Sequence, residues 1–579
     1  MMENVKKQKY TQDIIMLFGM VLVLVLSFWK SKYGLGGGDE AFDLTIAYRM
    51  CHGDKLFLHE WHVSQLSSFL LFPIMKLYLL LFNSTDAIIL HFRYIYIFVN
   101  LLVGCVAYFR LRKHGIGAVF AVVLYLLYVP YNIMNLSYDN MGLMCNFLCT
   151  IFLITSDEKY KIYLIAGIFY AGMVLCQPPL IFVFAVVFFV GLIFILVRRQ
   201  YKTLRKLGAF LAGCVIPAIP VLAYLLINVG IKNIVISLVG MMSDPEHSAT
   251  TNVLVIIYKT LLTYFPKATL SIGNVIALSV RKLLLISFAG FILVWLALIF
   301  DKHRKKRQAL YLILSGLCVI CVGAAYLVCV RDSYINFLLF AWALHGITFF
   351  VFEDKPERKV LLISYFIGLS HLIAFLGSNQ YGHVFGIALL PTCLIVIMLS
   401  IKQIEIRYKG CRNEIAVSQK VQDVFICLCV VISLVFLVYA RCVHVFRQTS
   451  PCTLSVCCDS GPQKGILVSE NTYENFETYL NDINDKDISQ NDNVLLLTEQ
   501  TWTYLCLDAP LAQYSAWLSG VNDKTYERLQ FYYEINPDKV PNKIFIEKES
   551  VEENTVKLWA DENDFQLHVG GALYFLEQN

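Results

Sequence analysis

The chain has 579 residues, of which 58% are hydrophobic and 16% are charged, and its formal net charge is +5. Soluble domains contain about 45–50% apolar and about 25% charged residues, so this composition indicates an integral membrane protein with many spans. Basic residues fall in short clusters between apolar runs rather than on one face, which argues against nucleic acid as a partner and for the lipid bilayer as the surroundings.

The first apolar run, 14–28, is too long for a typical signal-peptide core, and no small-x-small cleavage site follows it. We therefore expect a retained first span. A helix needs about 20 apolar residues to cross the hydrocarbon, and the runs that approach this length predict about 13 spans. The expected spans are 14–28, 87–109, 116–134, 141–155, 161–176, 180–197, 207–228, 283–300, 308–330, 334–352, 360–376, 383–401 and 422–440.

The apolar stretch 66–82 is short and carries Pro73 and Lys76 near its middle. If it does not cross and the N-terminus is cytoplasmic, almost every dense basic cluster falls on the cytoplasmic side, as the positive-inside rule requires. We interpret 66–82 as a juxtamembrane helix at the outer interface. An odd number of spans then makes this a multi-pass cell membrane protein whose C-terminal region is extracytoplasmic.

Composition divides the chain into a transmembrane domain, 1–440, and a polar tail, 441–579. The transmembrane domain is expected to carry two large outer loops, 30–86 and 229–282. In the tail, short apolar runs alternate with amphipathic helical stretches, which predicts a small α/β domain. Four cysteines of the tail fit either a disulfide in an oxidising compartment or a reduced state: Cys452, Cys457, Cys458 and Cys506.

Acidic residues are expected at the outer ends of two spans. Asp39 and Glu40 follow a triple glycine after the first span, and Asp139 lies at the outer end of the third, in LSYDNMG. Carboxylates from different helices at one membrane face can hold a divalent cation, Mg or Mn, or accept a proton from a substrate hydroxyl. Asp39 and Asp139 are therefore candidate metal ligands as well as candidate catalytic residues. The alternative is that each aspartate caps a helix, because Asp is a good N-cap residue.

Other polar groups are predicted at the same face. His59-Glu60-Trp61-His62 precedes the interfacial helix, although an aromatic anchor at the membrane surface explains it equally well. A Gly-Ser-Asn turn after the eleventh span could cradle a phosphate with its N–H groups, or be an ordinary turn. The spans carry almost no charged residues, unlike those of ion-coupled transporters. The candidate substrate-binding residues are Arg49, Lys55, His59, His62, Tyr138, Asn140, Gln177, Ser378 and Asn379.

The order of these features resembles the GT-C glycosyltransferases, in particular the protein O-mannosyltransferases and the bacterial aminoarabinose lipid A transferase. The resemblance rests on the Gly-rich turn with Asp39 and Glu40, the pattern Y-R-x-x-x-G-D that begins at Tyr48, the entry to the interfacial helix, and Asp139. It covers roughly residues 1–200. Beyond them it depends on the span count and the extracytoplasmic tail.

The resemblance implies a transferase that moves a sugar from a polyprenyl-phosphate donor to an extracytoplasmic acceptor in a single inverting displacement. It implies that an acid at Asp39, with Glu40 beside it, or at Asp139 activates the acceptor or helps to hold a metal, and Asp39 is our choice for activation. Relatives carry a basic residue where this chain has Gln177. The cation that neutralises the donor phosphate is therefore open among His59, His62, Arg49, Lys55 and a divalent ion.

Three alternatives remain beside this interpretation. A flippase for lipid-linked sugars would need a polar path through the spans. A polymerase or ligase of envelope glycans would use basic residues in a long outer loop, and 229–282 contains several. The third alternative is a non-catalytic scaffold with a degenerate site. The acceptor is equally open among a lipid, a protein and an envelope glycan.

Overall fold

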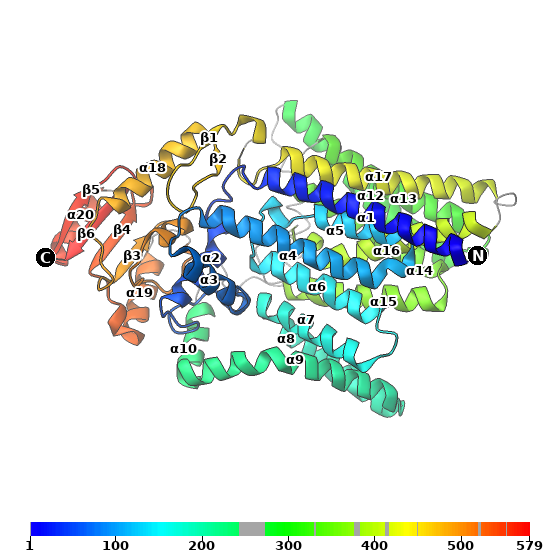
Figure 1. The fold of residues 1–579 in the computed structure, drawn as a ribbon, viewed down its shortest axis with the longest axis horizontal. Helices are drawn as coiled ribbons and strands as arrows, with labels where there is room; N and C mark the ends of the chain where they lie inside the picture. Colours follow the sequence, from blue (N-terminus) through cyan, green and yellow to red (C-terminus); the bar gives the residue numbers. More distant parts are fainter. Residues whose placement is uncertain are drawn as a thin grey trace.

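The computed structural model describes residues 2–242, 272–328, 332–375, 383–410, 416–448, 450–518, 523–551 and 553–578. The predicted phosphate-binding turn with Ser378 and Asn379 lies outside these ranges, as does most of the predicted loop 229–282. Within them, the chain forms a bundle of long helices with a mixed α/β region at one end (Figure 1).

Thirteen helices of the described chain coincide with the predicted spans. Their bounds are α1 Met2–Lys30, α4 Ile88–Leu111, α5 Ile116–Leu127, α6 Tyr138–Ile154, α7 Tyr160–Cys176, α8 Leu180–Val197, α9 Tyr201–Asn228, α12 Ile272–Phe300, α13 Gln308–Val328, α14 Asp332–Phe352, α15 Lys355–Ala374, α16 His383–Gly410 and α17 Val417–Val443.

Nine helices of the described chain are long and apolar enough to cross a membrane, which confirms a multi-pass membrane protein. Eight of the nine are among the predicted thirteen, and the ninth is Gln65–Phe82. The other five predicted spans are absent from the nine because α5, α6, α7 and the stretch Gln308–Ala324 of α13 are apolar but short, and α15 begins with charged residues. The candidate spans are Lys9–Lys30, Gln65–Phe82, Ile88–His114, Leu180–Val197, Tyr201–Asn228, Lys282–Phe300, Ile335–Phe352, His383–Tyr408 and Val417–Val443.

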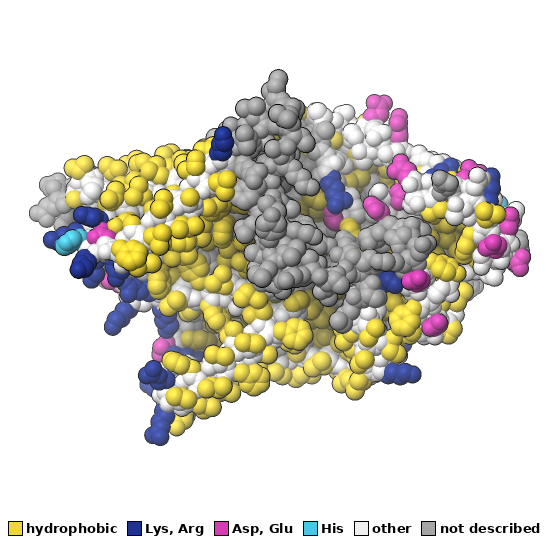
Figure 2. Space-filling view, turned by 180° about the vertical axis from the view of Figure 1, so that it is seen from behind, with side chains coloured by type: hydrophobic (Ala, Val, Ile, Leu, Met, Phe, Trp, Pro, Cys, Tyr) yellow, Lys and Arg dark blue, Asp and Glu magenta, His cyan; other side chains and the backbone are white. Residues whose placement is uncertain are grey.

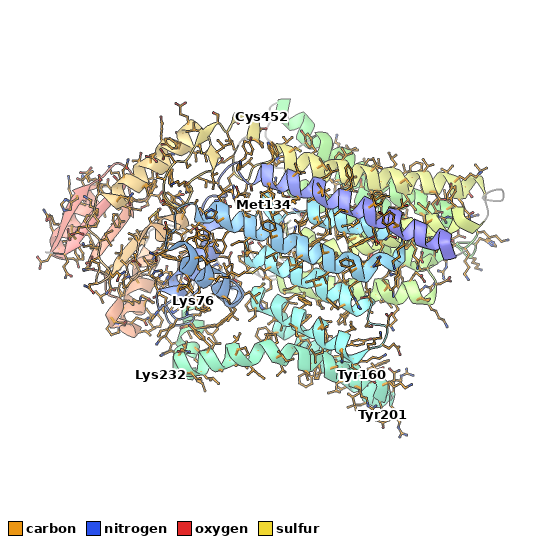
Figure 3. The ribbon with its side chains drawn as sticks, in the orientation of Figure 1. Lys76, Met134, Tyr160, Tyr201, Lys232 and Cys452 are labelled. Carbon is orange, nitrogen blue, oxygen red and sulfur yellow. The ribbon has the colours of Figure 1, made fainter. Side chains whose placement is uncertain are left out.

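The candidate span Gln65–Phe82 is the stretch that we interpreted as an interfacial helix, and it contains α3 (Ser68–Phe82). Its length and hydropathy suffice for a span. Figure 1 shows α3 at the end of the bundle that faces the C-terminal region, beside α2 (Gly38–Cys51). Figure 3 shows Lys76 of α3 and Lys232 of α10 (Ile231–Met242) near that end, and Tyr160 and Tyr201 toward the other. The helix α3 thus packs beside α2 at the end of the bundle that meets the C-terminal region.

Close helix packing holds the bundle together. The helix α16 is almost wholly buried and packs against α5, α6, α14 and α15. Where α7 meets α9, a Cβ atom at Gly167 would lie 2.0 Å from the carbonyl oxygen of Phe210, so only glycine permits this approach. Small residues are the usual means by which helices approach each other in lipid. Large apolar side chains cover much of the bundle's exposed sides (Figure 2).

The C-terminal region confirms the predicted α/β character. Its main sheet has the order β3-β4-β6-β5, in which β3 (Val494–Leu497) and β4 (Lys543–Glu547) are parallel while β6 (Leu573–Gln578) is antiparallel to both β4 and β5 (Phe565–Val569). A two-stranded ribbon, β1 (Val456–Cys457) and β2 (Leu467–Val468), precedes it. The helices of the region are α18 Glu470–Asn484, α19 Asp523–Ile535 and α20 Glu553–Glu562, and all four of its cysteines are free thiols.

Alternating side chains give the sheet two apolar faces, as strand geometry dictates. Leu496 and Phe545 pack on the side of α18, whereas Leu495 and Ile544 pack with residues of α19 and α20. Phe42 of α2 belongs to this second core. The first loop and the C-terminal region therefore share a core.

Backbone and hydroxyl groups strengthen this junction. Tyr48 Oη of α2 donates to the Leu507 carbonyl at 3.0 Å, and Thr45 Oγ1 donates to the Thr501 carbonyl at 3.0 Å. The Gly34 N–H donates to the Leu467 carbonyl at 2.8 Å. These bonds hold α2 between the bundle and the C-terminal region.

We expect an impermeant maleimide to label two exposed positions from opposite sides of the membrane. Arg304 lies in the loop between α12 and α13, and Lys464 lies in the C-terminal region at the other end of the bundle. In a cysteine-depleted background, R304C should react only in inverted vesicles and K464C only in intact cells. Labelling of both positions from the same side would contradict an odd number of spans between Arg304 and Lys464.

Candidate functional site

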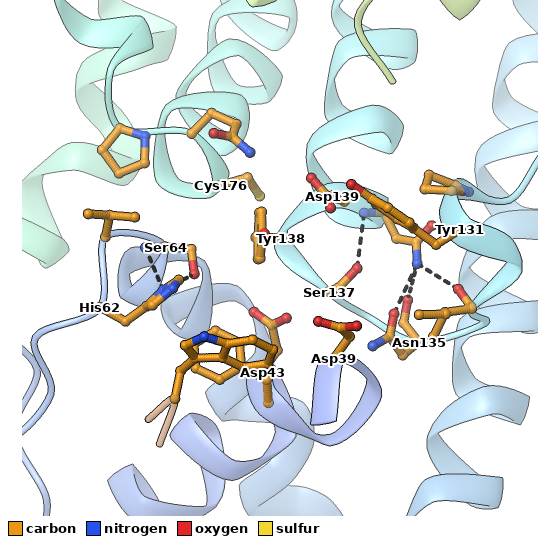
Figure 4. Close-up of a pocket in the computed structure, with 18 of the residues that line it drawn as sticks. Asp39, Asp43, His62, Ser64, Tyr131, Asn135, Ser137, Tyr138, Asp139 and Cys176 are labelled. Atoms are coloured by element: carbon orange, nitrogen blue, oxygen red, sulfur yellow. Dashed lines mark hydrogen bonds between the residues drawn. The ribbon is translucent and has the colours of Figure 1, made fainter. Parts of the chain in front are cut away.

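A cavity of about 460 Å³ lies where the bundle meets the C-terminal region. It brings together six predicted site residues from separate parts of the chain. Figure 4 shows Asp39, Asp43 and Asp139 around it, with Tyr138 between the two aspartates of α2 and Cys176. The predicted residues in its lining are Asp39, His62, Tyr138, Asp139, Asn140 and Gln177.

The helix α2 presents two carboxylates to the cavity, Asp39 and Asp43. The sequence prediction missed Asp43. Residues four apart share a face of a helix, whereas the next residue lies about 100° around it. Once the helix begins at Gly38, Asp39 therefore faces the same way as Asp43, and Glu40 faces elsewhere. The spacing within DEAFD was the signal that could have found Asp43.

Glu40 is buried in a bidentate ion pair with Arg93 of α4. Arg93 Nε lies 2.6 Å from Glu40 Oε1, and Nη2 lies 2.7 Å from Oε2. The same guanidinium donates to the carbonyls of Ser31 and Gly34, and the Gly36 N–H donates to Glu40. Glu40, which we expected beside Asp39 at the site, does not line the cavity, and these contacts give it a structural role: it fixes the glycine-rich turn and the direction of α2.

Asp139 enters the cavity from the first turn of α6. The N-cap of α6 is Ser137, whose Oγ accepts from the Asn140 N–H at 3.3 Å, and the N-cap of α2 is Gly37. Neither Asp39 nor Asp139 is therefore an N-cap residue, which was the alternative explanation for the two aspartates. Both still lie in a first helical turn, where the helix dipole favours negative charge.

The segment before α6 has an unusual backbone that shapes one wall of the cavity. Tyr131 and Asn132 have φ values of 52° and 60°, in the left-handed region that residues other than glycine rarely adopt. Asn132 Nδ2 donates to the carbonyls of Ala440 and His444, which holds this conformation. Asn140 Nδ2 donates to the Ile133 and Asn135 carbonyls. Asn140 therefore positions this wall as well as lining the cavity.

The only Arg or Lys in the described lining is one that the prediction missed, Arg447. Its Nη2 lies 3.1 Å from Asp39 Oδ2, and its side chain is 62% exposed. It follows the last span, more than 400 residues after Asp39, so no local pattern links the two. Trp517 of the C-terminal region also lines the cavity and packs edge-on against Phe42.

Asp43 differs from Asp39 in its surroundings. It is 2% exposed, accepts from Ser67 Oγ at 3.1 Å, and also accepts from the Tyr138 N–H. Burial raises the pKa of Asp43 to about 7, and these two hydrogen bonds limit the rise. The cavity thus contains one carboxyl that titrates near neutrality beside one that is paired with an arginine.

His62 and Gln177 lie on other walls. His62 Nδ1 lies 2.7 Å from Ser64 Oγ, and its ring packs edge-on against Phe42. Gln177 ends α7 and precedes the Pro178–Pro179 turn, which also lines the cavity. On this side the lining is mostly apolar.

Arg49, His59 and Lys55 do not line this cavity. Arg49 Nε lies 2.7 Å from Asp54, its Nη1 lies 2.9 Å from Glu60, and its Nη2 donates to the His59 and Gln513 carbonyls. These contacts anchor Arg49 between the first loop and the C-terminal region, away from the cavity where substrate binding was predicted.

The same network accounts for His59. His59 Nδ1 lies 3.4 Å from Asp54 Oδ1, and Lys539 Nζ lies 2.7 Å from that oxygen. Burial raises the pKa of Asp54, but Arg49 and Lys539 outweigh it and hold the pKa below its usual range. Glu60 accepts from Ser515 Oγ and the Ala516 N–H, which ties the first loop to the segment that carries Trp517.

The residues present do not form a metal site by themselves. Among the described residues, no group of three or more His, Cys, Asp and Glu side chains is arranged to hold a metal ion. Asp39, one of the two predicted ligands, is paired with Arg447.

Comparison of the chain with known protein families and with curated proteins finds no match.

Asp43→Asn should stabilise the protein more at pH 8 than at pH 5. The folded-state pKa of Asp43, about 7, lies above the usual 3.8. The folded protein therefore binds this proton more tightly, so stability is highest below about pH 4 and falls until about pH 7. Between pH 5 and pH 8 the loss is roughly 2–3 kcal/mol, and the asparagine variant should escape it.

Thermal unfolding with a thiol-reactive dye at both pH values measures this difference. Asp86→Asn, which changes a carboxyl that is 55% exposed, is the control. An equal gain at both pH values would show that Asp43 does not titrate in this range.

Glu40→Ala should destabilise the protein strongly, whereas Asp39→Asn at the neighbouring position should not. The first change leaves a buried guanidinium without its carboxylate, which costs about 3–5 kcal/mol. The second removes only a partly exposed ion pair, worth about 0–1 kcal/mol. Melting temperatures in detergent compare the two, and equal losses would contradict the structural role of Glu40.

Proposed function

We propose that the protein is a membrane glycosyltransferase of the GT-C type, with about thirteen spans. It transfers a sugar from a polyprenyl-phosphate donor to an extracytoplasmic acceptor. The observation that carries the proposal is the meeting of Asp39, Asp139 and Arg447 in one cavity at the end of the bundle. Carboxylates can take a proton from an acceptor hydroxyl, and a guanidinium matches the geometry of a phosphate.

The position of the cavity suits a lipid-linked donor. Its polar side is formed by α2 and Arg447, while Cys176, Pro178, Pro179 and Ala374 line the side toward the bundle. A polyprenyl chain belongs among apolar helices, and its phosphate belongs at the surface. We propose Arg447 as the cation that neutralises the donor phosphate. The sequence had offered His59, His62, Arg49, Lys55 and a divalent ion for this role.

The proposed sugar transfer requires one proton acceptor and one phosphate-binding group. The acceptor oxygen attacks C1 of the sugar while its proton passes to Asp39. The C1–oxygen bond to the phosphate breaks, and its electron pair stays on the polyprenyl phosphate. When Arg447 turns to the donor phosphate, it releases Asp39 from their ion pair. The leaving group is already a stabilised anion, so positioning supplies most of the rate.

The orientation follows the positive-inside rule. Lys and Arg side chains gather at the end of the bundle away from the C-terminal region (Figure 2). This supports a cytoplasmic N-terminus, and in the proposed orientation the cavity faces the outside. A flippase is a weaker candidate, because the charged groups that line the cavity lie at the end of the bundle rather than along a path through it.

Retention of undecaprenyl or dolichyl phosphate by the purified protein, measured by mass spectrometry, tests the proposal. Arg447→Gln should reduce this retention by about tenfold or more, since a charge-assisted hydrogen bond contributes about 1.5–3 kcal/mol. Asp39→Asn should keep the lipid but abolish transfer of a radiolabelled sugar.

Lys464→Gln removes an exposed cation outside the cavity and is the matched control. Absence of any polyprenyl phosphate from the wild type would refute the proposed donor. Full transfer by Asp39→Asn would remove Asp39 from the mechanism.

A further inference from the structure

A second cavity, of about 590 Å³, lies in the C-terminal region next to the first. Arg447 lines both cavities, and Gly37, at the start of α2, lines the second. Its other walls come from α18, from the segment before and within Thr501–Cys506, and from the turns that follow β4 and precede β6. It has the size of a typical small-molecule site.

Its lining is rich in amides, hydroxyls and carboxylates. Asn475, Gln500 and Gln448 offer both donors and acceptors, and Thr472 and Thr478 add hydroxyls. Glu547 and Glu549 are balanced by Lys548 and Arg447, so the lining has no net charge. Such a surface suits a neutral, hydroxyl-rich ligand and offers little to an anionic headgroup.

An aromatic cluster forms part of the same wall. The rings of Phe476 and Trp502 lie 4.8 Å apart, and Tyr479 and Trp502 lie 6.2 Å apart. Trp502 Nε1 donates to Gln500 Oε1 at 3.2 Å, which orients both side chains. Phe476 and Trp502 are 3% and 5% exposed, so the half-buried Tyr479 offers most of the aromatic surface. The C–H face of a sugar ring packs on such a surface while its hydroxyls bond to planar amides and carboxylates.

One buried group in this lining points to a missing donor. Gln463 is 1% exposed, and its Oε1 accepts no hydrogen bond from the described part of the chain. A buried acceptor without a partner costs about 1–3 kcal/mol. A ligand hydroxyl that entered from the cavity would satisfy it.

We propose that this second cavity binds a neutral saccharide, which is the acceptor of the transfer. The assignment as acceptor rests on the proposed function; saccharide binding itself does not. The shared Arg447 and the neighbouring Gly37 would bring a hydroxyl of the bound saccharide toward Asp39. Among the acceptor classes that the sequence left open, the lining therefore favours a glycan over a lipid headgroup or a protein.

The test is binding of the full-length protein, in nanodiscs and fluorescently labelled, to an array of neutral oligosaccharides, acidic oligosaccharides and peptides. The wild type should be retained by neutral oligosaccharides. Asn475→Leu and Gln500→Leu should each reduce this signal by about tenfold, the effect of 1.4 kcal/mol. Asn471→Leu, an exposed position of α18 outside the cavity, should leave it unchanged.

Melting temperatures show that the variants are folded. Retention by peptides or acidic glycans alone, no retention at all, or equal retention of Asn475→Leu and wild type would each overturn the proposal. Retention of polyprenyl phosphate is measured on the same preparation. If that lipid binds and saccharides do not, only the acceptor site fails; if saccharides bind and the lipid does not, the proposed donor fails.

Discussion

The buried ion pair between Arg93 and Glu40 is the constraint on which the site depends. A charged pair taken out of water stabilises a structure only when its geometry is good and its remaining hydrogen-bonding groups are satisfied. Here the guanidinium also binds two carbonyls, those of Ser31 and Gly34, one at the end of the first helix and one in the glycine-rich turn. The pair therefore sets where α2 begins and how it is rotated, and the rotation decides which carboxylates reach the cavity.

A second buried arginine, Arg49, fixes the other end of α2 in the same way. Arg49 joins Asp54 and Glu60, and Glu60 in turn binds the segment that ends at Trp517. The two arginines thus fix α2 against the bundle and against the C-terminal region. The cavity is the space between these two bodies, and its lining changes if either contact is lost.

The sequence predicts the elements of this site better than the roles of its residues. The apolar runs, the placement of Asp39 and Asp139 at the same end of the bundle and the α/β tail follow from composition and periodicity. The separate roles of Asp39 and Glu40 do not follow from them. These roles depend on a helix that starts at Gly38, and a run of three glycines does not determine where the helix starts. Arg447 and Trp517 reach the cavity through tertiary contacts across hundreds of residues, which no spacing encodes. Arg49 and His59 are predicted to bind substrate because their pairing with Asp54 depends on how the first loop folds, and because a further buried partner of Arg49, Gln513, lies in the distant tail.

The charge of the cavity follows from this arrangement. Three carboxyls and one arginine would repel an incoming phosphate if all were ionised. Burial favours the neutral form of Asp43, and the ion pair with Arg447 offsets Asp39. Near neutral pH the cavity therefore carries less negative charge than its composition suggests. In the transfer that we propose, an anionic donor then approaches Arg447, and the carboxylate that Arg447 releases becomes the base when the donor phosphate binds.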